Sequence, residues 1–162
     1  MEVVFSHMPA TLEEFTSMPE FHFATPFQVA ALFVIAICNY PRSDELCYDM
    51  LDAIKGPQKL SIRDKSFIRE RMSDKKDYLG KAYLKGAAPG NNYEPTQPYT
   101  VIVGENPYTY VNEGYAVLYI KTTGADSPRP ITLRKKGNEW FLWEFPGPLS
   151  GIRIPVSQDA WA

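Results

Sequence analysis

An apolar run of twelve residues, from Phe27 to Cys38, constrains the fold of this chain more than any other feature. Thr25 opens the run in a T-x-x-Q capping pattern, Pro26 occupies the first helical position, and Pro41 follows the run. A helix that is apolar nearly all round must be covered on most sides, so residues 26–40 are predicted to form the central core helix. Because the run is far shorter than the ~20 residues that cross a bilayer, we expect no membrane contact.

Three further helices are expected around this one. They begin at the capping residues Thr11, Ser43 and Ser61. They end at Pro19, at Gly56-Pro57 and near Met72. All ten glycines lie at or after residue 56, and nine of the fourteen prolines lie after residue 88. The chain is therefore expected to form helices first and strands later.

The second half of the chain carries four predicted strands, over residues 99–103, 115–121, 131–135 and 140–144. Gly137-Asn138 joins the last two as a type II′ turn, in which the glycine takes positive φ. This turn sets a register that pairs Lys135 with Trp140, Arg134 with Phe141, Leu133 with Leu142 and Thr132 with Trp143. Signals between residues 73 and 97 are weaker and indicate mostly loop.

These patterns predict one α+β domain over residues 1–162, a length that fits the prior of about 150 residues per domain. The four expected helices lie within residues 11–72. The helical part of the domain, with the connection that follows the last helix, extends to about residue 85. An antiparallel sheet of four to five strands follows over about residues 98–155.

Alternation along the strands gives the predicted sheet two different faces. The aliphatic face, expected to meet the helices, takes Ala116, Leu118, Ile120, Ile131, Leu133, Trp140 and Leu142. The opposite face takes Tyr115, Val117, Tyr119, Lys121, Arg134, Phe141 and Trp143. Contiguous exposed aromatic area marks partner sites, so we expect this second face to bind a protein or a small-molecule ligand without catalysis. In the alternative, the C-terminal tail ending in Trp161-Ala162 folds back and covers it.

The loop from Gly124 to Pro130 supplies two further candidate contact residues, Asp126 and Arg129. Its prolines stiffen the chain, so Arg129 could clamp a carboxylate or phosphate. The interpretation that we favour is structural, with both side chains locking the crossover. A rival hypothesis is a small enzyme acting on a sugar or an acidic metabolite, in which Asp126 or Glu144 converges with Arg129 in one concave pocket.

Motifs around this loop resemble the C-terminal signature of an uncharacterised bacterial domain family, a domain of unknown function. The residues that carry the resemblance are Gly-Ala-Asp-Ser-Pro-Arg-Pro at 124–130, Leu133-Arg134, Gly137, Trp140, Leu142-Trp143-Glu144, Ile152-Arg153, Pro155 and Asp159-Ala-Trp161. The resemblance implies a bacterial source, of Gram-positive type, and a single α+β unit. It supplies no catalytic residue.

Charge is unevenly distributed along the chain. The formal net charge is −2, but residues 1–54 carry −7, residues 55–85 carry +6 and residues 86–162 carry −1. The basic segment 55–85 could attract an anionic partner such as RNA. We favour its compensation by the acidic first part of the chain and expect no binding to nucleic acid.

The sequence contains no motif for metal binding, nucleotide binding or serine-hydrolase chemistry. His7 and His22, and Cys38 and Cys47, have no spacing typical of metal ligands. Both cysteines are interpreted as reduced and structural. Phosphate-binding glycine loops and the hydrolase G-x-S-x-G motif are missing. No metal or other cofactor is therefore expected.

Glu2 stands where a signal peptide would place positive charge, so the cytoplasm is the expected compartment.

Overall fold

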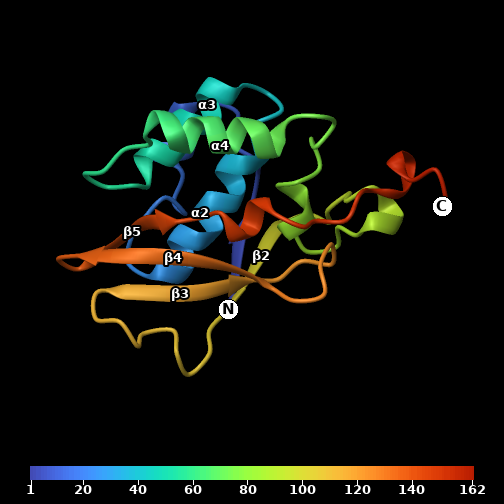
Figure 1. The fold of residues 1–162 in the computed structure, drawn as a ribbon. Helices are drawn as coiled ribbons and strands as arrows, with labels where there is room; N and C mark the ends of the chain where they lie inside the picture. The colour runs from blue at the N-terminus through green and yellow to red at the C-terminus, as the bar shows by residue number, and fades with distance from the viewer.

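The computed structural model describes all residues of the chain, 1–162, as a five-stranded antiparallel sheet covered on one side by helices (Figure 1). The elements are β1 (Glu2–Phe5), α1 (Leu12–Ser17), α2 (Pro26–Cys38), α3 (Asp44–Ala53), α4 (Ile62–Met72), β2 (Tyr99–Gly104), β3 (Tyr115–Ile120), β4 (Arg129–Lys136) and β5 (Glu139–Glu144). Short 3₁₀ turns are η1 (Lys81–Tyr83), η2 (Pro89–Asn91), η3 (Gly147–Leu149) and η4 (Val156–Gln158). The expected α+β class is confirmed.

Helix α2 lies between the sheet and the outer helices α3 and α4 (Figure 1). It contacts all five strands on one side and α3 on the other, and Val29 to Ile37 are buried without a break. The prediction of a central core helix is thus confirmed. None of the helices combines the length and the apolar character that crossing a bilayer would require.

All four predicted helix starts have the expected N-cap hydrogen bond, although the Gln28 side chain donates to the carbonyl oxygen of Glu20 at 2.6 Å and does not close the T-x-x-Q box. Thr11, Thr25 and Ser43 each accept a hydrogen bond from the backbone N–H three residues later, at 3.1–3.2 Å. Ser61 and Asp64 form a reciprocal capping box. These local contacts satisfy backbone donors that a helix end leaves free, so the sequence predicts where each helix begins.

One strand differs from the sequence prediction. The sheet order is β1-β2-β3-β4-β5, and its first strand comes from the N-terminus, before any helix. β1 pairs with β2 in a register that places Val3 opposite Val101, and it buries Val3 and Phe5 while Glu2 and Val4 face solvent. The fifth strand was expected in the C-terminal half because a four-residue segment has too short an alternation to be read without its partner.

The β4–β5 hairpin confirms the predicted turn and most of the predicted register. Gly137 has φ +63°, and β4 and β5 pair as expected from the turn to Leu133 opposite Leu142. Beyond that pair a β-bulge shifts the register, so Thr132 faces Glu144 and not Trp143. Trp143 is the additional residue on β5, and such a residue is re-aimed by the local bend.

A second correction concerns Arg129, which was predicted in a loop but begins β4 opposite Ile120. Prolines on both sides did not prevent pairing, because proline fits a strand wherever its missing N–H is not needed for the ladder. The next residue, Pro130, accordingly pairs with Tyr119.

Candidate functional site

A pocket of about 280 Å³ opens between the loop that follows α3 and the β4–β5 hairpin. The loop and the hairpin turn lie on the same side of the molecule in Figure 1. The pocket, called here the Trp143 pocket, is lined by Lys55, Pro57, Gln58, Arg134, Lys135, Lys136, Phe141, Leu142 and Trp143. Three of these, Arg134, Phe141 and Trp143, belong to the predicted aromatic face.

Backbone contacts fix the loop against the outer edge of β5. The N–H of Leu142 donates to the carbonyl oxygen of Ile54 at 2.9 Å, and that of Trp140 donates to Phe23 at 2.9 Å. These bonds occupy donors that an edge strand would otherwise leave free. The loop next to Ile54 is therefore held beside the hairpin, and one wall of the pocket with it.

Lys55 is the most deeply buried charged residue of the pocket and of the chain. It is 6% exposed, and its Nζ lies 5.6 Å from the ring centroid of Phe145. The ammonium group makes no hydrogen bond and no ion pair, since the only ion pairs in the structure are Lys85–Glu2 and Arg153–Asp126. Burial lowers the pKa of Lys55, because desolvation penalises the charged form.

Two carboxylates near Lys55 act on it only through space. Asp64 and Asp52 partly oppose the lowering of the Lys55 pKa, but neither forms an ion pair with the lysine. Asp52 accepts a hydrogen bond from the backbone N–H of Leu60 at 2.7 Å, and Asp64 accepts one from Ser61 at 2.9 Å. Both groups hold backbone N–H donors, and their charges compensate that of the lysine only in part.

Arg134 is held by aromatic rings. Its guanidinium carbon lies 4.5 Å from the ring centroid of Trp143 and 5.4 Å from that of Tyr115, and the two rings are 6.1 Å apart. The guanidinium makes no hydrogen bond or ion pair with the protein. A guanidinium stacked through its faces keeps its N–H groups available at the rim of its plane.

Lys135 and Lys136, both exposed, complete a set of four cationic side chains around the pocket. The Nζ of Lys135 lies 5.7 Å from the ring centroid of Trp140. No carboxylate, imidazole, thiol or hydroxyl side chain lines the pocket. Its charge is therefore uniformly positive, although the chain as a whole carries −2.

The structure separates the predicted contact residues into two groups. Tyr115, Arg134, Phe141 and Trp143 come together at the Trp143 pocket or directly beside it. Within this group Phe141 is half-buried at the sheet edge, where it packs on Phe23 with ring centroids 5.2 Å apart.

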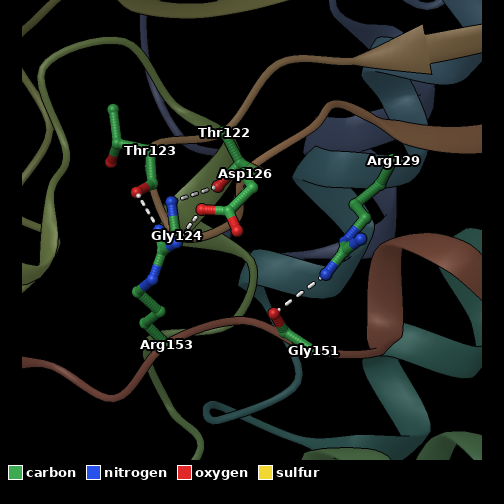
Figure 2. Close-up of polar contacts among 7 residues, drawn as sticks. All are labelled: Thr122, Thr123, Gly124, Asp126, Arg129, Gly151 and Arg153. Atoms are coloured by element: carbon green, nitrogen blue, oxygen red, sulfur yellow. Dashed lines mark hydrogen bonds and ion pairs between the residues drawn. The ribbon is translucent and has the colours of Figure 1, made fainter.

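The remaining predicted residues lie elsewhere. Tyr119 and Asp126 line a separate, open depression of about 740 Å³. Arg129 donates from Nη2 to the carbonyl oxygen of Gly151 at 2.9 Å, whereas Asp126 pairs with Arg153 (Figure 2). Glu144 lines a third cavity, of about 260 Å³, on the far side of Trp143. Asp126, Arg129 and Glu144 thus share no pocket.

These contacts around the 124–130 loop connect it to the C-terminal segment. Arg153 also donates from Nη1 to the carbonyl oxygen of Thr123 at 3.4 Å (Figure 2). The backbone N–H of Gly124 donates to the hydroxyl of Thr122 at 3.0 Å. The loop is therefore built into the fold and fastens the segment that follows η3.

The C-terminal tail does not cover the aromatic face. Ser157 donates from its backbone N–H to Asn92 at 2.9 Å, and Gln158 donates to the carbonyl oxygen of Lys75 at 2.8 Å. Trp161 is 96% exposed, and the chain ends on the opposite side of the molecule from the β4–β5 turn (Figure 1). The alternative in which the tail folds back over the sheet is therefore wrong.

The basic segment 55–85 forms one ion pair with the acidic first part of the chain, Lys85–Glu2 at 3.6 Å. Other cations of the segment lie over aromatic rings, Lys65 over Tyr48 at 5.6 Å and Arg71 over Phe67 at 5.2 Å. The compensation expected from the sequence is thus largely not made by direct ion pairs.

No sequence motif marks Lys55 as a site residue, although the spacing of the buried positions before it carries a signal. The buried positions Cys47, Leu51 and Lys55 are spaced by four, so the lysine continues the core-facing stripe of α3 past its end. A lysine at a core-facing position is unusual, because Lys is almost never fully buried unless paired.

The chain was compared with protein families, curated proteins and solved structures. A family model described as a domain of unknown function (DUF6935) matches residues 7–156. The match confirms the resemblance to an uncharacterised domain family. No curated protein and no solved structure matches the chain.

Proposed function

The chain belongs to this family, a domain of unknown function (DUF6935), and from its site we propose that it is a non-enzymatic binding module. It recognises its partner with the aromatic face formed by Tyr115, Arg134, Phe141 and Trp143, and the Trp143 pocket is the centre of the contact. A ligand bound there contacts aromatic rings and cationic side chains together.

The observation that supports this function most is the unpaired charge of the pocket. Four cationic side chains and two aromatic rings line it, with no carboxylate among them. Apolar surface with a few convergent polar groups is typical of ligand pockets. The rival enzyme hypothesis has weaker support, because Asp126, Arg129 and Glu144 lie at three different places.

A thermal-shift screen with a mixed panel of anionic, neutral and cationic small molecules tests the proposal. Compounds that stabilise the protein should lose their effect in Trp143→Ala and keep it in the control Trp161→Ala, because Trp161 lies far from the pocket and is 96% exposed. A ligand stabilises by binding the folded state alone. A panel with no stabilising compound, or with compounds that act equally on both variants, would overturn the proposal.

A further inference from the structure

The Trp143 pocket gathers four cationic side chains with no carboxylate in its lining. The sequence holds 19 acidic residues, yet none lines this pocket. Folding therefore leaves a positive site that an anion from outside the chain could complete, because walls of low dielectric strengthen such attraction.

Lys55 gives the argument for a specific occupant. Lys55 is 6% exposed as a residue, and its ammonium keeps some contact with solvent but makes no hydrogen bond or ion pair with the protein. Removing most of the water around a charge costs free energy unless a counter-charge offsets it. The cation–π contact with the Phe145 ring offsets only part of this cost, because an aromatic face attracts a cation more weakly than a carboxylate does. An anionic ligand in the pocket would supply the ion pair that the protein itself does not give to Lys55.

Arg134 adds directional donors on the same pocket. Arg134 is exposed, and its guanidinium lies over the rings of Trp143 and Tyr115 with its N–H groups open to solvent. A guanidinium fork of this kind matches the oxygens of a carboxylate or a phosphate. The volume of about 280 Å³ lies just below the range of about 300 to 1,000 Å³ that ligand pockets span, so it fits a small charged group rather than a polymer.

We infer that the Trp143 pocket binds a small ligand through a multiply charged oxyanion, a phosphate ester or a di- or tricarboxylate, with Lys55 and Arg134 as its anchors. This inference rests on the proposed binding function and specifies its ligand. Phosphates and clustered carboxylates share the recognition chemistry, and the experiment distinguishes them.

The experiment uses Trp143 as its own reporter. The full chain carrying Trp140→Phe and Trp161→Phe has Trp143 as its sole tryptophan, and its emission is followed while pyrophosphate or citrate is added at constant ionic strength. We expect a saturable change with at least one of the two anions. Saturation by pyrophosphate alone assigns a phosphate, and saturation by citrate alone assigns a carboxylate ligand.

Matched substitutions in this background test the anchors. Lys55→Met keeps a side chain of similar length and removes the charge, so it should weaken binding about 10-fold or more, as a lost ionic contact in a pocket does. The control Lys81→Met removes one exposed charge outside the pocket and should change affinity less than about twofold. Circular dichroism checks that each variant is folded, and Arg134→Gln provides a second test of the same site.

The possible results distinguish failure of anion binding from failure of the proposed binding function. An emission change that does not saturate, or that is equal in Lys55→Met and Lys81→Met, is charge screening and overturns the inference. If neither anion binds while neutral or cationic compounds still depend on Trp143, the inference fails and the binding function stands. If no compound depends on Trp143, both fail.

Discussion

Gly56 and Phe141 meet so closely that a methyl group added to the glycine would lie 2.9 Å from the phenylalanine ring. Gly56 also has φ +65°, a conformation that side chains disfavour. This contact joins the loop after α3 to β5, far apart in the sequence, and so places Lys55 beside Trp143.

Gly56→Ala should therefore destabilise the fold by about 2 to 4 kcal/mol, the sum of backbone strain and steric overlap. Gly137→Ala is the matched control, because Gly137 has φ +63° but nothing within 4 Å of an added Cβ. It should lose only about 1 kcal/mol. Urea denaturation measures both, and equal losses would show that the Phe141 contact contributes nothing.

Lys55→Met should raise the free energy of unfolding at pH 7, by about 1 kcal/mol, because it removes a largely desolvated ammonium that has no ion pair, and this gain exceeds the loss of the cation–π contact with Phe145. The control Lys81→Met alters an exposed side chain and should stay within about 0.5 kcal/mol of the wild type. A destabilised Lys55→Met protein would show that the charge itself supports the fold.

The advantage of Lys55→Met should shrink as the pH rises. Because burial lowers the pKa of Lys55 below its usual 10.5, the folded protein releases this proton before the unfolded chain does. The wild type therefore gains stability through this group between the folded-state pKa and 10.5. Tyr48 and Tyr93, whose pKa values burial raises to about 12, work in the opposite direction but are common to both proteins. Chemical denaturation between pH 7 and 10 gives the difference, and a constant gap would contradict the argument.

Most of the fold follows from short-range patterns. The capping residues predict the start of α2, and the apolar run predicts its end at residue 40, two residues beyond the observed Cys38. Gly137-Asn138 sets the hairpin register by turn geometry as far as the pair Leu133–Leu142. β1 could not be predicted from such patterns, because a four-residue segment can be assigned as a strand only from its pairing with β2.

The candidate site depends on contacts that no local pattern encodes. The alternation along β3, β4 and β5 correctly predicted that Tyr115, Arg134 and Trp143 share one face. The pocket itself also needs the bond from Leu142 to Ile54. That bond joins residues from the two halves of the chain, so the position of Lys55 beside the hairpin follows only from the tertiary structure.

The two cysteines should be unreactive in the folded protein. Burial raises the pKa of the Cys38 thiol to about 12 and raises that of Cys47 as well, so almost no thiolate is present at pH 8. Alkylation by iodoacetamide should be at least about 100-fold slower than in denaturant, as counted by mass spectrometry. Rapid labelling of either cysteine under native conditions would show that its segment opens.

Ile37→Asp should abolish the fold, since Ile37 is 1% exposed in the centre of α2 and an unpaired carboxylate in the core costs several kcal/mol. Ile62→Asp is the control, because Ile62 is 87% exposed on α4. Circular dichroism and NMR line dispersion should show an unfolded chain in the first case and an unchanged fold in the second. A folded Ile37→Asp protein would remove α2 from the centre of the core.

The basic segment 55–85 should not bind nucleic acid despite its net charge of +6. Its cations are dispersed, with Lys55 in the Trp143 pocket, Lys65 over Tyr48 and Lys85 paired with Glu2. Counterion release from a phosphate backbone needs many cations aligned on one surface. Single-stranded and duplex oligonucleotides at low salt, where attraction is strongest, should show no affinity tighter than about 100 µM. Micromolar binding that weakens steeply with added salt, and that is lost in the double variant Lys75→Glu with Lys76→Glu, would overturn this expectation and assign the segment a nucleic-acid partner.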